Sequence, residues 1–444
     1  MTKLKARDYL LSVQHLFAMF GATVLVPLLT GLNPSLALFS AGIGTLIFHL
    51  CTQMKVPVFL GSSFAFLPAI AAVIKKDGVV VPENVPLAQG GIIAAGVIYI
   101  LLAVIVYFVG ADRMKKIFPP VVTGPVIVVI GIGLSSTAIK DALGDPAFSG
   151  VMTSMHVKNI LIALFTLAIV VVCTIFAKGF FKLVPILIGI VAGYLLCVVL
   201  SWFDLYTMDF TPIKTAMDSS VAGFNIPFYT KDANDVMFMQ LPKFDWSVIL
   251  SIAPIAIVTF MEHIGDITTN GAVVGKDFIK DPGLHRTLLG DGCATLFAGL
   301  VGGPPNTTYS ENTGVLATTK NYNPKLLRVT AIFAIILGLI APFGAALQTI
   351  PSPVKGGVEI MLFGMIAAIG IRTLAEANLD FTHSRNLIIV ALILVCGLGI
   401  GGVGGLTLII KDYTFNISGL FVAVIVGILA NLILPNEEDK TAKA

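Results

Sequence analysis

The sequence is dominated by long apolar segments that follow one another along almost the whole chain. A helix needs about 20 mostly apolar residues to cross a lipid bilayer. Twelve segments of this kind are centred near residues 21, 44, 100, 129, 167, 191, 256, 294, 337, 362, 395 and 425. Of the 444 residues, 56% are hydrophobic and 12% are charged, whereas an average soluble domain has roughly 25% charged residues. The chain is therefore predicted to be an all-α polytopic membrane protein.

Two shorter segments, centred near residues 66 and 312, are too polar to be complete spans. They follow Pro57 and the Pro304-Pro305 pair, and they contain Ser, Thr, Asn and Gly. Irregular backbone at membrane depth is tolerated only where protein or a water-filled cavity surrounds it. We therefore predict two half-helices with extended lead-ins that share a central cavity. The N–H groups of Phe64 and Tyr309, at the starts of these helices, are expected to point into it with positive partial charge.

Counting both short segments gives fourteen spans, and the positive charges indicate their orientation. With both termini in the cytoplasm, nineteen of the 28 lysines and arginines fall on the inner side, as expected for cytoplasmic loops. The net charge of +3 and the short basic clusters do not indicate a nucleic-acid partner. The five cysteines have no metal-ligand spacing, so we expect no metal site.

The two halves of the chain share short motifs at corresponding places. "GSSFAF" (61–66) matches "NTTYSE" (306–311), which aligns Phe64 with Tyr309, and "PVVTG" (120–124) matches "PVKGG" (353–357). Transporters are often built from two inverted repeats whose interrupted helices meet at the membrane midplane. Seven spans in each half predict such an inverted repeat, joined by an outer loop near residues 203–245.

Few ionisable residues lie inside the apolar segments, and each is a functional candidate. Glu262 and Asp266 are four residues apart and share a helix face, from which His263 is turned away. Glu311 lies in the second interrupted segment, and Asp291 lies in the segment between them. Carboxylates in one desolvated cavity repel each other, so at least one of them is expected to carry a proton. We hypothesise that this proton is transported together with a substrate.

Structural roles remain open for several of these residues. Asp266 fits a proton relay or a helix cap equally well, and Asp291 fits a functional or a structural role equally well. His263 and His15 fit helix packing better than ligand binding. Hydroxyls occur in both interrupted segments without an adjacent histidine, so a hydrolase nucleophile is disfavoured. The glycine-rich run 397–405 indicates close helix packing rather than phosphate binding.

Five motifs resemble one known family. They are "SVQHLFAMFGATVLVPLL" (12–29), "GSSFAF", "EHIGD" (262–266), "DPGLHR" (281–286) and "PNTTYSENTGVLATTK" (305–320). The last contains an acidic or amide residue followed by Asn-x-Gly-x-x-x-x-Thr and a basic residue. Together they resemble the nucleobase-ascorbate transporters (nucleobase:cation symporter 2 family), and within it the bacterial uracil permeases, over essentially the whole chain.

The resemblance implies fourteen spans as two inverted seven-span repeats, with spans 3 and 10 interrupted, in the bacterial cytoplasmic membrane. It divides them into a core domain and a gate domain, with homodimers in several members. The implied boundaries are 1–117 (core, spans 1–4), 118–204 (gate, spans 5–7), 205–245 (extracellular loop), 246–349 (core, spans 8–11), 350–437 (gate, spans 12–14) and 438–444 (cytoplasmic tail).

The resemblance also implies a uracil:proton symporter that needs no cofactor and has no catalytic residue. The implied substrate-binding residues are Phe64, Glu262, Tyr309, Ser310 and Glu311, the implied proton-coupling residues are Glu262, Asp266 and Glu311, and the supporting residues are His15, Asp291 and Asn312. Uracil has two N–H donors and two carbonyl acceptors, which suit two carboxyl groups and two helix-terminal N–H groups.

The alternative is a symporter for xanthine or uric acid. Purine-type members commonly have Gln where this chain has Glu311, which favours a pyrimidine here. An anion transporter with a related fold needs a positive pocket, which two glutamates oppose. Three positions depart from some uracil-type relatives, namely Asp266 (His in some), Ser310 (Gly in some) and Phe363 on the gate side (Tyr in some).

Overall fold

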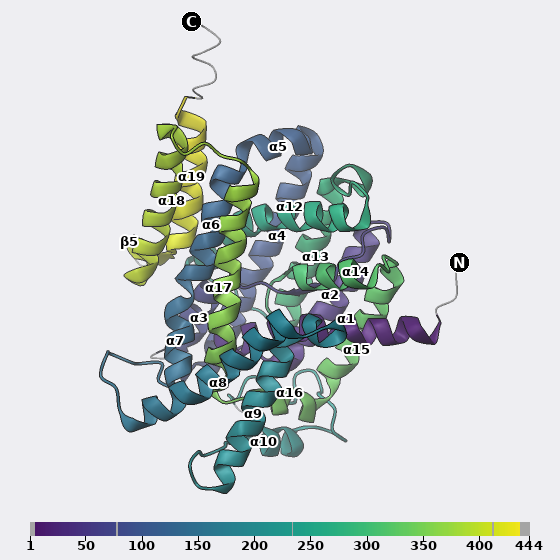
Figure 1. Ribbon diagram of the computed structural model, residues 1–444, viewed down its shortest axis with the longest axis vertical. Coiled ribbons are helices and arrows are strands. Elements are labelled where there is room, and N and C mark those ends of the chain that lie inside the picture. The colour runs from purple at the N-terminus through teal and green to yellow at the C-terminus, as the bar shows by residue number, and fades with distance from the viewer. Residues whose placement is uncertain (1–4, 77–78, 233, 411–412, 436–444) are drawn as a thin grey trace, which may run out of the picture.

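A computed structural model describes residues 5–76, 79–232, 234–410 and 413–435, and Figure 1 shows that helices make up most of it. The predicted tail 438–444 lies outside the described residues. The α-helices are α1 (Ala6–Thr30), α2 (Pro34–Cys51), α3 (Leu67–Ile74), α4 (Val85–Val109), α5 (Ala111–Ile117), α6 (Pro120–Gly133), α7 (Ser135–Leu143), α8 (Ser154–Phe176), α9 (Pro185–Trp202), α10 (Thr211–Ser219), α11 (Trp246–Ile252), α12 (Ile255–Val274), α13 (Leu284–Val301), α14 (Ser310–Thr319), α15 (Pro324–Leu339), α16 (Ala341–Gln348), α17 (Ser352–Glu376), α18 (Ser384–Gly402) and α19 (Gly419–Ile433). Shorter turns are η1 (Pro82–Asn84), η2 (Gly179–Leu183) and η3 (Ile279–Gly283).

Three small antiparallel pairs of strands connect helices. They are β1 (Leu60–Ser62) with β4 (Asn306–Thr308), β2 (Lys75–Lys76) with β3 (Val79–Val80), and β5 (Leu406–Ile410) with β6 (Tyr413–Ile417). The pair β1–β4 joins segments about 245 residues apart in the sequence. Each of its strands leads into a short helix, α3 of 8 residues and α14 of 10 residues, as the two polar segments predict.

Nine stretches of the described residues are long and apolar enough to cross a membrane. The predicted segments near residues 294, 337 and 425 instead fall on α13, α15 and α19, which do not meet this criterion. A helix surrounded by other helices needs no fully apolar surface, because its polar groups find protein partners. Thus α13 lies against α2 and α4 and buries Asp291 and Thr295 completely.

Close packing of helices relies on glycines where two backbones approach. A Cβ on Gly292 of α13 would meet the backbone of Ile100 in α4 at 3.1 Å, and a Cβ on Gly42 of α2 would meet the carbonyl oxygen of Ala331 in α15 at 2.6 Å. Small residues at such crossings permit the van der Waals contact that holds membrane helices together. The helices α2, α4, α13 and α15 therefore form one tightly packed group, which we call the first helix group. It also includes α1, which packs on α15 and α2, and α3, which packs on α4 and α1.

A second group of helices comprises α6, α17, α18 and α19, with α7, α8 and α9 packed against α17. In Figure 1, α18 and α19 lie beside α6 on one flank of the molecule, while α2, α13 and α15 lie on the other. The two groups meet in an apolar cluster that we call the interface cluster. Its main members are Leu25, Leu29, Leu67, Leu134, Ala138, Val358, Leu362 and Phe363.

Candidate substrate site at the paired strands

The strands β1 and β4 pair antiparallel, β1 against α2 and β4 against α13, and they bring both interrupted segments together. Their register pairs Leu60 with Thr308, Gly61 with Thr307 and Ser62 with Asn306. The Ser63 N–H extends the ladder by donating to the carbonyl oxygen of Pro305 at 2.9 Å. Backbone groups that would otherwise be unpaired at this depth are thus satisfied between the two segments.

Two threonines satisfy the backbone of the strands from the side. The Leu60 N–H donates to Oγ1 of Thr45 in α2 at 2.9 Å. The Asn306 N–H donates to Oγ1 of Thr295 in α13 at 3.2 Å, and this hydroxyl donates to the Asn306 carbonyl oxygen at 3.0 Å. All four residues are completely buried. The sequence reasoning did not identify these threonines, because nothing in their local sequence shows that they face an extended segment.

Tyr309 holds the two paired strands together through its backbone and its side chain. Its N–H donates to the carbonyl oxygen of Phe59 at 3.1 Å, so the prediction that this N–H is free to face a cavity is wrong. Strand pairing extends one residue further than the sequence indicates. The Tyr309 side chain is 5% exposed, and its hydroxyl donates to the Ser62 carbonyl oxygen at 2.9 Å. A Cβ on Gly61 would lie 2.3 Å from the tyrosine ring, so this ring packs directly on the glycine.

Phe64 has a different environment from Tyr309. It is half-buried, and its ring contacts that of Phe363 in α17, with 5.9 Å between centroids and an interplanar angle of 76°. This edge-to-face contact joins the first helix group to the second. The two aromatic residues that the repeat aligns are therefore not equivalent, since one is a buried anchor and the other lies between the helix groups.

Three carboxyl groups face the start of α14. Glu262 and Asp266 lie one turn apart on α12, and Glu311 lies in the first turn of α14. Asp266 accepts hydrogen bonds from the hydroxyls of Thr308 at 2.9 Å and Ser310 at 2.6 Å. Glu262 is close enough to Asp266 and Glu311 for electrostatic repulsion. The structure thus brings together the three acidic residues that the sequence singles out as proton-coupling candidates.

Glu262 and Glu311 differ from Asp266 in their hydrogen bonding. Both are half-buried, and neither is hydrogen-bonded to another side chain within the described part of the chain. The helix α14 also has no side-chain cap at its start, so the N–H groups of its first turn are directed at the same region. Carboxyl groups next to a helix N-terminus can hold a ligand that has both donors and acceptors.

His263 is turned away from these carboxyl groups into a buried chain of hydrogen bonds. Its Nδ1 lies 2.8 Å from Oδ2 of Asp291, and its Nε2 lies 2.9 Å from Oγ1 of Thr287. Thr287 donates its own proton to the Leu284 carbonyl oxygen, so it accepts from His263 Nε2–H. One further proton is then shared between His263 and Asp291. Both residues connect α12 to α13, which fits the packing role that the sequence analysis favoured for His263.

Asn312 and His15 fasten α14 to α1. The Asn312 side-chain amide donates to the His15 carbonyl oxygen at 3.0 Å and lies 3.2 Å from its Nδ1. Asn270 fastens α14 to α12 in the same way, since its amide donates to Oγ1 of Thr313 at 3.0 Å and to the Pro57 carbonyl oxygen at 3.1 Å. Sequence reasoning missed Asn270, although it lies four residues after Asp266 and therefore on the same helix face.

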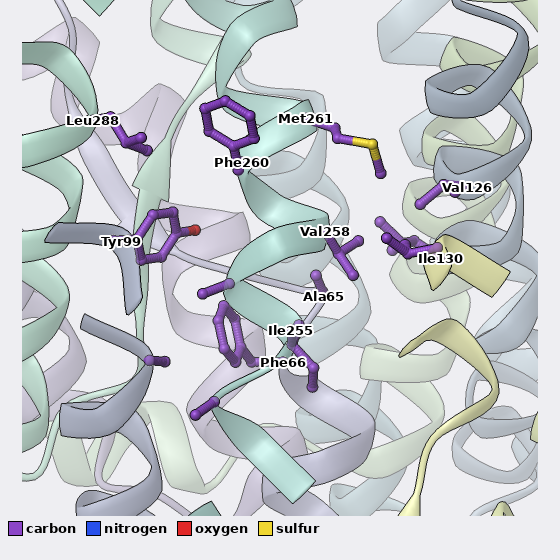
Figure 2. Close-up of a cluster of buried hydrophobic side chains, with 14 of the residues drawn as sticks. Ala65, Phe66, Tyr99, Val126, Ile130, Ile255, Val258, Phe260, Met261 and Leu288 are labelled. Carbon is purple, nitrogen blue, oxygen red and sulfur yellow. The ribbon is translucent and has the colours of Figure 1, made fainter. Parts of the chain in front are cut away.

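Apolar side chains surround this polar region on α12. Figure 2 shows Tyr99 of α4 on one side of the helix next to Phe260, and Val126 and Ile130 of α6 on the other side next to Val258 and Met261. A separate cavity of about 410 Å³ adjoins Phe64, and mostly apolar residues of α3, α6, α11, α18 and α19 line it. Neither Glu262 nor Glu311 lines this cavity.

A family model and the curated relatives of this chain agree on one family. Residues 7–403 match the profile of the Permease family (Xan_ur_permease). A uracil permease of Bacillus caldolyticus is 44% identical over 425 residues, covering 96% of this chain and 91% of the relative, and one of Bacillus subtilis is 43% identical over 432 residues, covering 97% and 93%. Among solved structures, the transmembrane domain of a cyanobacterial bicarbonate transporter, BicA, has a TM-score of 0.59 at 14% identity, covering 96% of this chain and 97% of that domain. This last similarity concerns the fold alone.

Proposed function

Since this chain belongs to the Permease family, we propose that it takes up uracil together with protons across the bacterial cytoplasmic membrane. The two Bacillus relatives are uracil permeases, and they are similar to this chain over nearly their whole length. As a multi-pass permease, the chain is a transporter and not an enzyme.

The observation that carries the proposal is the meeting of Glu262 and Glu311 beside the start of α14. Both carboxyl groups have no side-chain partner within the described residues, while Asp266 between them is already satisfied by two hydroxyls. A flat ring with two N–H donors and two carbonyl acceptors would complement two carboxyl groups and the N–H groups of a helix start. We assign Phe64 to contact the ring and Ser310 to border it, and we assign Tyr309 to hold the strand that positions Glu311.

Proton coupling follows from the same arrangement. Three acidic groups within electrostatic range of one another cannot all be ionised without a large penalty. In our proposal one proton is shared by Glu262 and Glu311, and Asp266 relays it. Uracil then binds best to the protonated site, so that substrate and proton move together. His15, Asp291 and Asn312 support the site through α1, α13 and α14.

For the architecture, we propose fourteen spans in two inverted repeats with both termini in the cytoplasm. The core comprises 1–117 and 246–349, the gate comprises 118–204 and 350–437, and the loop 205–245 lies outside the cell. The two helix groups and the antiparallel pairing of β1 with β4 support this division. Alternating access would arise from movement of one helix group against the other around the site at the β1–β4 pair. A homodimer formed by two such chains is also part of the proposal.

Uptake of labelled uracil into proteoliposomes with an imposed inward proton gradient tests the function. We expect accumulation that a protonophore abolishes and that unlabelled uracil or thymine inhibits, whereas xanthine and ascorbate do not. If xanthine competes and uracil does not accumulate, the substrate is a purine and the assignment of Glu311 as the pyrimidine marker is wrong. Uptake of uracil that does not depend on the proton gradient would refute the proposed proton coupling.

A further inference from the structure

A second acidic pair lies away from the candidate substrate site. Glu359 of α17 is 0% exposed, and within the part of the chain that the structure describes no group donates a hydrogen bond to either of its carboxyl oxygens. The carboxyl group of Asp141 in α7 is its acidic neighbour, where α7 packs closely against α17 at Gly356, and Oδ2 of Asp141 likewise has no donor among the described residues. Two carboxyl groups form a hydrogen bond only when one of them carries a proton.

Two lysines balance the charge of this pair. Lys355, one turn before Glu359 on α17, has its Nζ 3.9 Å from Oδ2 of Asp141, and both side chains are 15% exposed. Lys75 at the end of α3 lies within electrostatic range of both carboxyl groups. Its Nζ donates to the Leu29 carbonyl oxygen of α1 at 2.6 Å. The pair is thus formed by the second helix group, while Lys75 approaches it from the first.

The other helices packed against α17 add little charge here. The ranges of α6 and α9 contain no Asp, Glu, Lys, Arg or His. In α8 the charged candidates, His156 and Lys158, lie in the first turns, and His156 Nε2 is 3.4 Å from Asp145. In α7 the charged residue beside Asp141 is Lys140, which is exposed. Among the described residues, Lys75, Lys355 and Asp141 are therefore the charged groups that act on Glu359.

The position of Glu359 on its helix connects it to the contact between the helix groups. Residues 355, 359 and 363 lie on one face of α17, since they are spaced by four. Phe363 packs against Phe64, and its neighbours Val358 and Leu362 belong to the interface cluster with Leu25, Leu29 and Leu67. Separation of α1 and α3 from α17 would therefore admit water to Glu359.

An ionised carboxylate that is buried without donors is strongly unfavourable. We propose that Glu359 and Asp141 form a proton-binding site separate from the substrate carboxylates, and that the interface cluster closes only when Glu359 carries a proton. In the closed state the Glu359 O–H donates to the Asp141 carboxylate, whose charge Lys355 offsets. When the helix groups separate, Glu359 becomes hydrated and releases this proton to water.

The inference rests on the proposed function for its orientation, in which α17 begins at the extracellular side. The cluster then closes the outer path, and proton binding from outside favours closure. Acidic conditions outside the cell would thus favour the state that leads inward, which suits a symporter driven by an inward proton gradient.

The test measures how often the outer side opens, and it needs no substrate. Leu29, which is 4% exposed in the interface cluster, is replaced in a Leu29→Cys variant of the full chain, and whole cells are labelled with a membrane-impermeant maleimide. The chain without this substitution gives the background from native cysteines. A Val151→Cys variant, at a position that is 76% exposed, gives the intrinsic pH dependence of the thiol reaction.

After this correction, labelling of Leu29→Cys should rise about tenfold per unit of external pH over the range in which opening releases one proton. Adding Glu359→Gln should keep labelling low and remove this slope, because Gln is neutral and still donates to Asp141. Adding Asp141→Asn should keep the slope but move it to lower pH, because a neutral partner favours the proton on Glu359 less. The control Glu376→Gln, an exposed position on the same helix, should match the parent.

A slope that persists in Glu359→Gln, or labelling of the parent that does not change with pH, would overturn the proposal. If Glu359→Gln fails to fold, the shift expected for Asp141→Asn decides in its place. Equilibrium binding of uracil to the purified variants separates the two proposals. Normal pH-dependent labelling without uracil binding would refute the substrate assignment alone, whereas normal binding without the slope would refute the proton site alone.

Discussion

Single side chains differ in how completely their hydrogen bonds are satisfied, and this distinguishes Glu262 and Glu311 from their neighbour. Asp266 has two hydroxyl donors, whereas the two glutamates have no side-chain partner within the described residues. Glu262→Gln and Glu311→Gln keep the size of each side chain and remove its charge. A hydrogen bond to a charged group contributes about 1.5–3 kcal/mol, so each variant should lose about tenfold or more in uracil uptake into proteoliposomes.

The matched control is again Glu376→Gln, which removes an exposed charge whose ion pair among the described residues is with Arg372 on the same helix. Its uptake should equal that of the unaltered chain. Uptake unchanged in both Glu262→Gln and Glu311→Gln would contradict the assignment of the site. A loss restricted to Glu262→Gln would leave Glu311 without the role that we assign to it in distinguishing pyrimidines.

At Gly61, the packing depends on the absence of a side chain. Its missing side chain leaves room for the ring of Tyr309, and a Cβ there would lie 2.3 Å from two ring atoms. Gly61→Ala must displace either the ring or β1, and such overpacking typically costs about 1–3 kcal/mol. We expect a lower midpoint of thermal unfolding in detergent together with reduced uracil uptake. Gly399→Ala, on α18 with open space around it, is the control, and equal midpoints for the two variants would refute the argument.

At the scale of secondary-structure elements, the interrupted helices depend on side chains from helices that surround them. Thr295 both accepts from and donates to the backbone of Asn306. Thr295→Val keeps the shape and leaves two buried backbone groups unpaired, at about 1–3 kcal/mol for each. The variant should therefore unfold at a clearly lower temperature than the unaltered protein.

Thr318→Val provides the comparison, because Thr318 is exposed on α14 and, among the described residues, its hydroxyl donates to the Gly314 carbonyl oxygen of its own helix. We expect it to change the unfolding temperature little. If Thr295→Val is as stable as Thr318→Val, the strand β4 obtains its stability from β1 alone and the threonine contributes nothing.

The same elements show what sequence reasoning can and cannot predict. Prolines and polar residues predicted both short helices and their extended lead-ins, since these signals are local. The ladder between β1 and β4 joins residues about 245 apart in the sequence. The Tyr309 N–H, which was expected to be free, is hydrogen-bonded to the carbonyl oxygen of Phe59 as part of this pairing. Glu262, Asp266 and Glu311 were found because charge inside an apolar segment is conspicuous. Thr45, Thr295 and Asn270 were missed because such residues are common in helices and reveal their partners only in three dimensions.

At the scale of the whole molecule, the loop between the two halves is attached to the helices by a buried carboxylate. Asp232 is 8% exposed. Its Oδ1 accepts the N–H groups of Asn234 and Val236 at 2.9 and 3.0 Å, and its Oδ2 accepts from the side-chain amide of Gln348 in α16 at 3.1 Å. Burial nevertheless raises the pKa of Asp232 from 3.8 to about 6, and Asp235 nearby acts in the same direction.

This shift makes the stability of the protein depend on pH. Between about pH 4 and pH 6 the folded state holds a proton on Asp232 that the unfolded state has already released. The contribution of Asp232 is therefore most favourable below about pH 4 and is lost as pH rises through 6. Two pKa units correspond to about 3 kcal/mol. Asp232→Asn keeps an oxygen for the two N–H groups and cannot ionise, so it should be more stable than the unaltered protein at pH 7.5.

Thermal unfolding of the detergent-purified protein from pH 4.5 to 7.5 measures this difference. The unaltered chain should lose more stability over the range than Asp232→Asn, and the two curves should converge at the acidic end. Asp218→Asn, an exposed position in the same loop, should follow the unaltered chain throughout. Parallel curves for the unaltered chain and Asp232→Asn would mean that the proton on Asp232 does not bind more tightly in the folded state. The attachment of the loop to α16 would then be insensitive to pH.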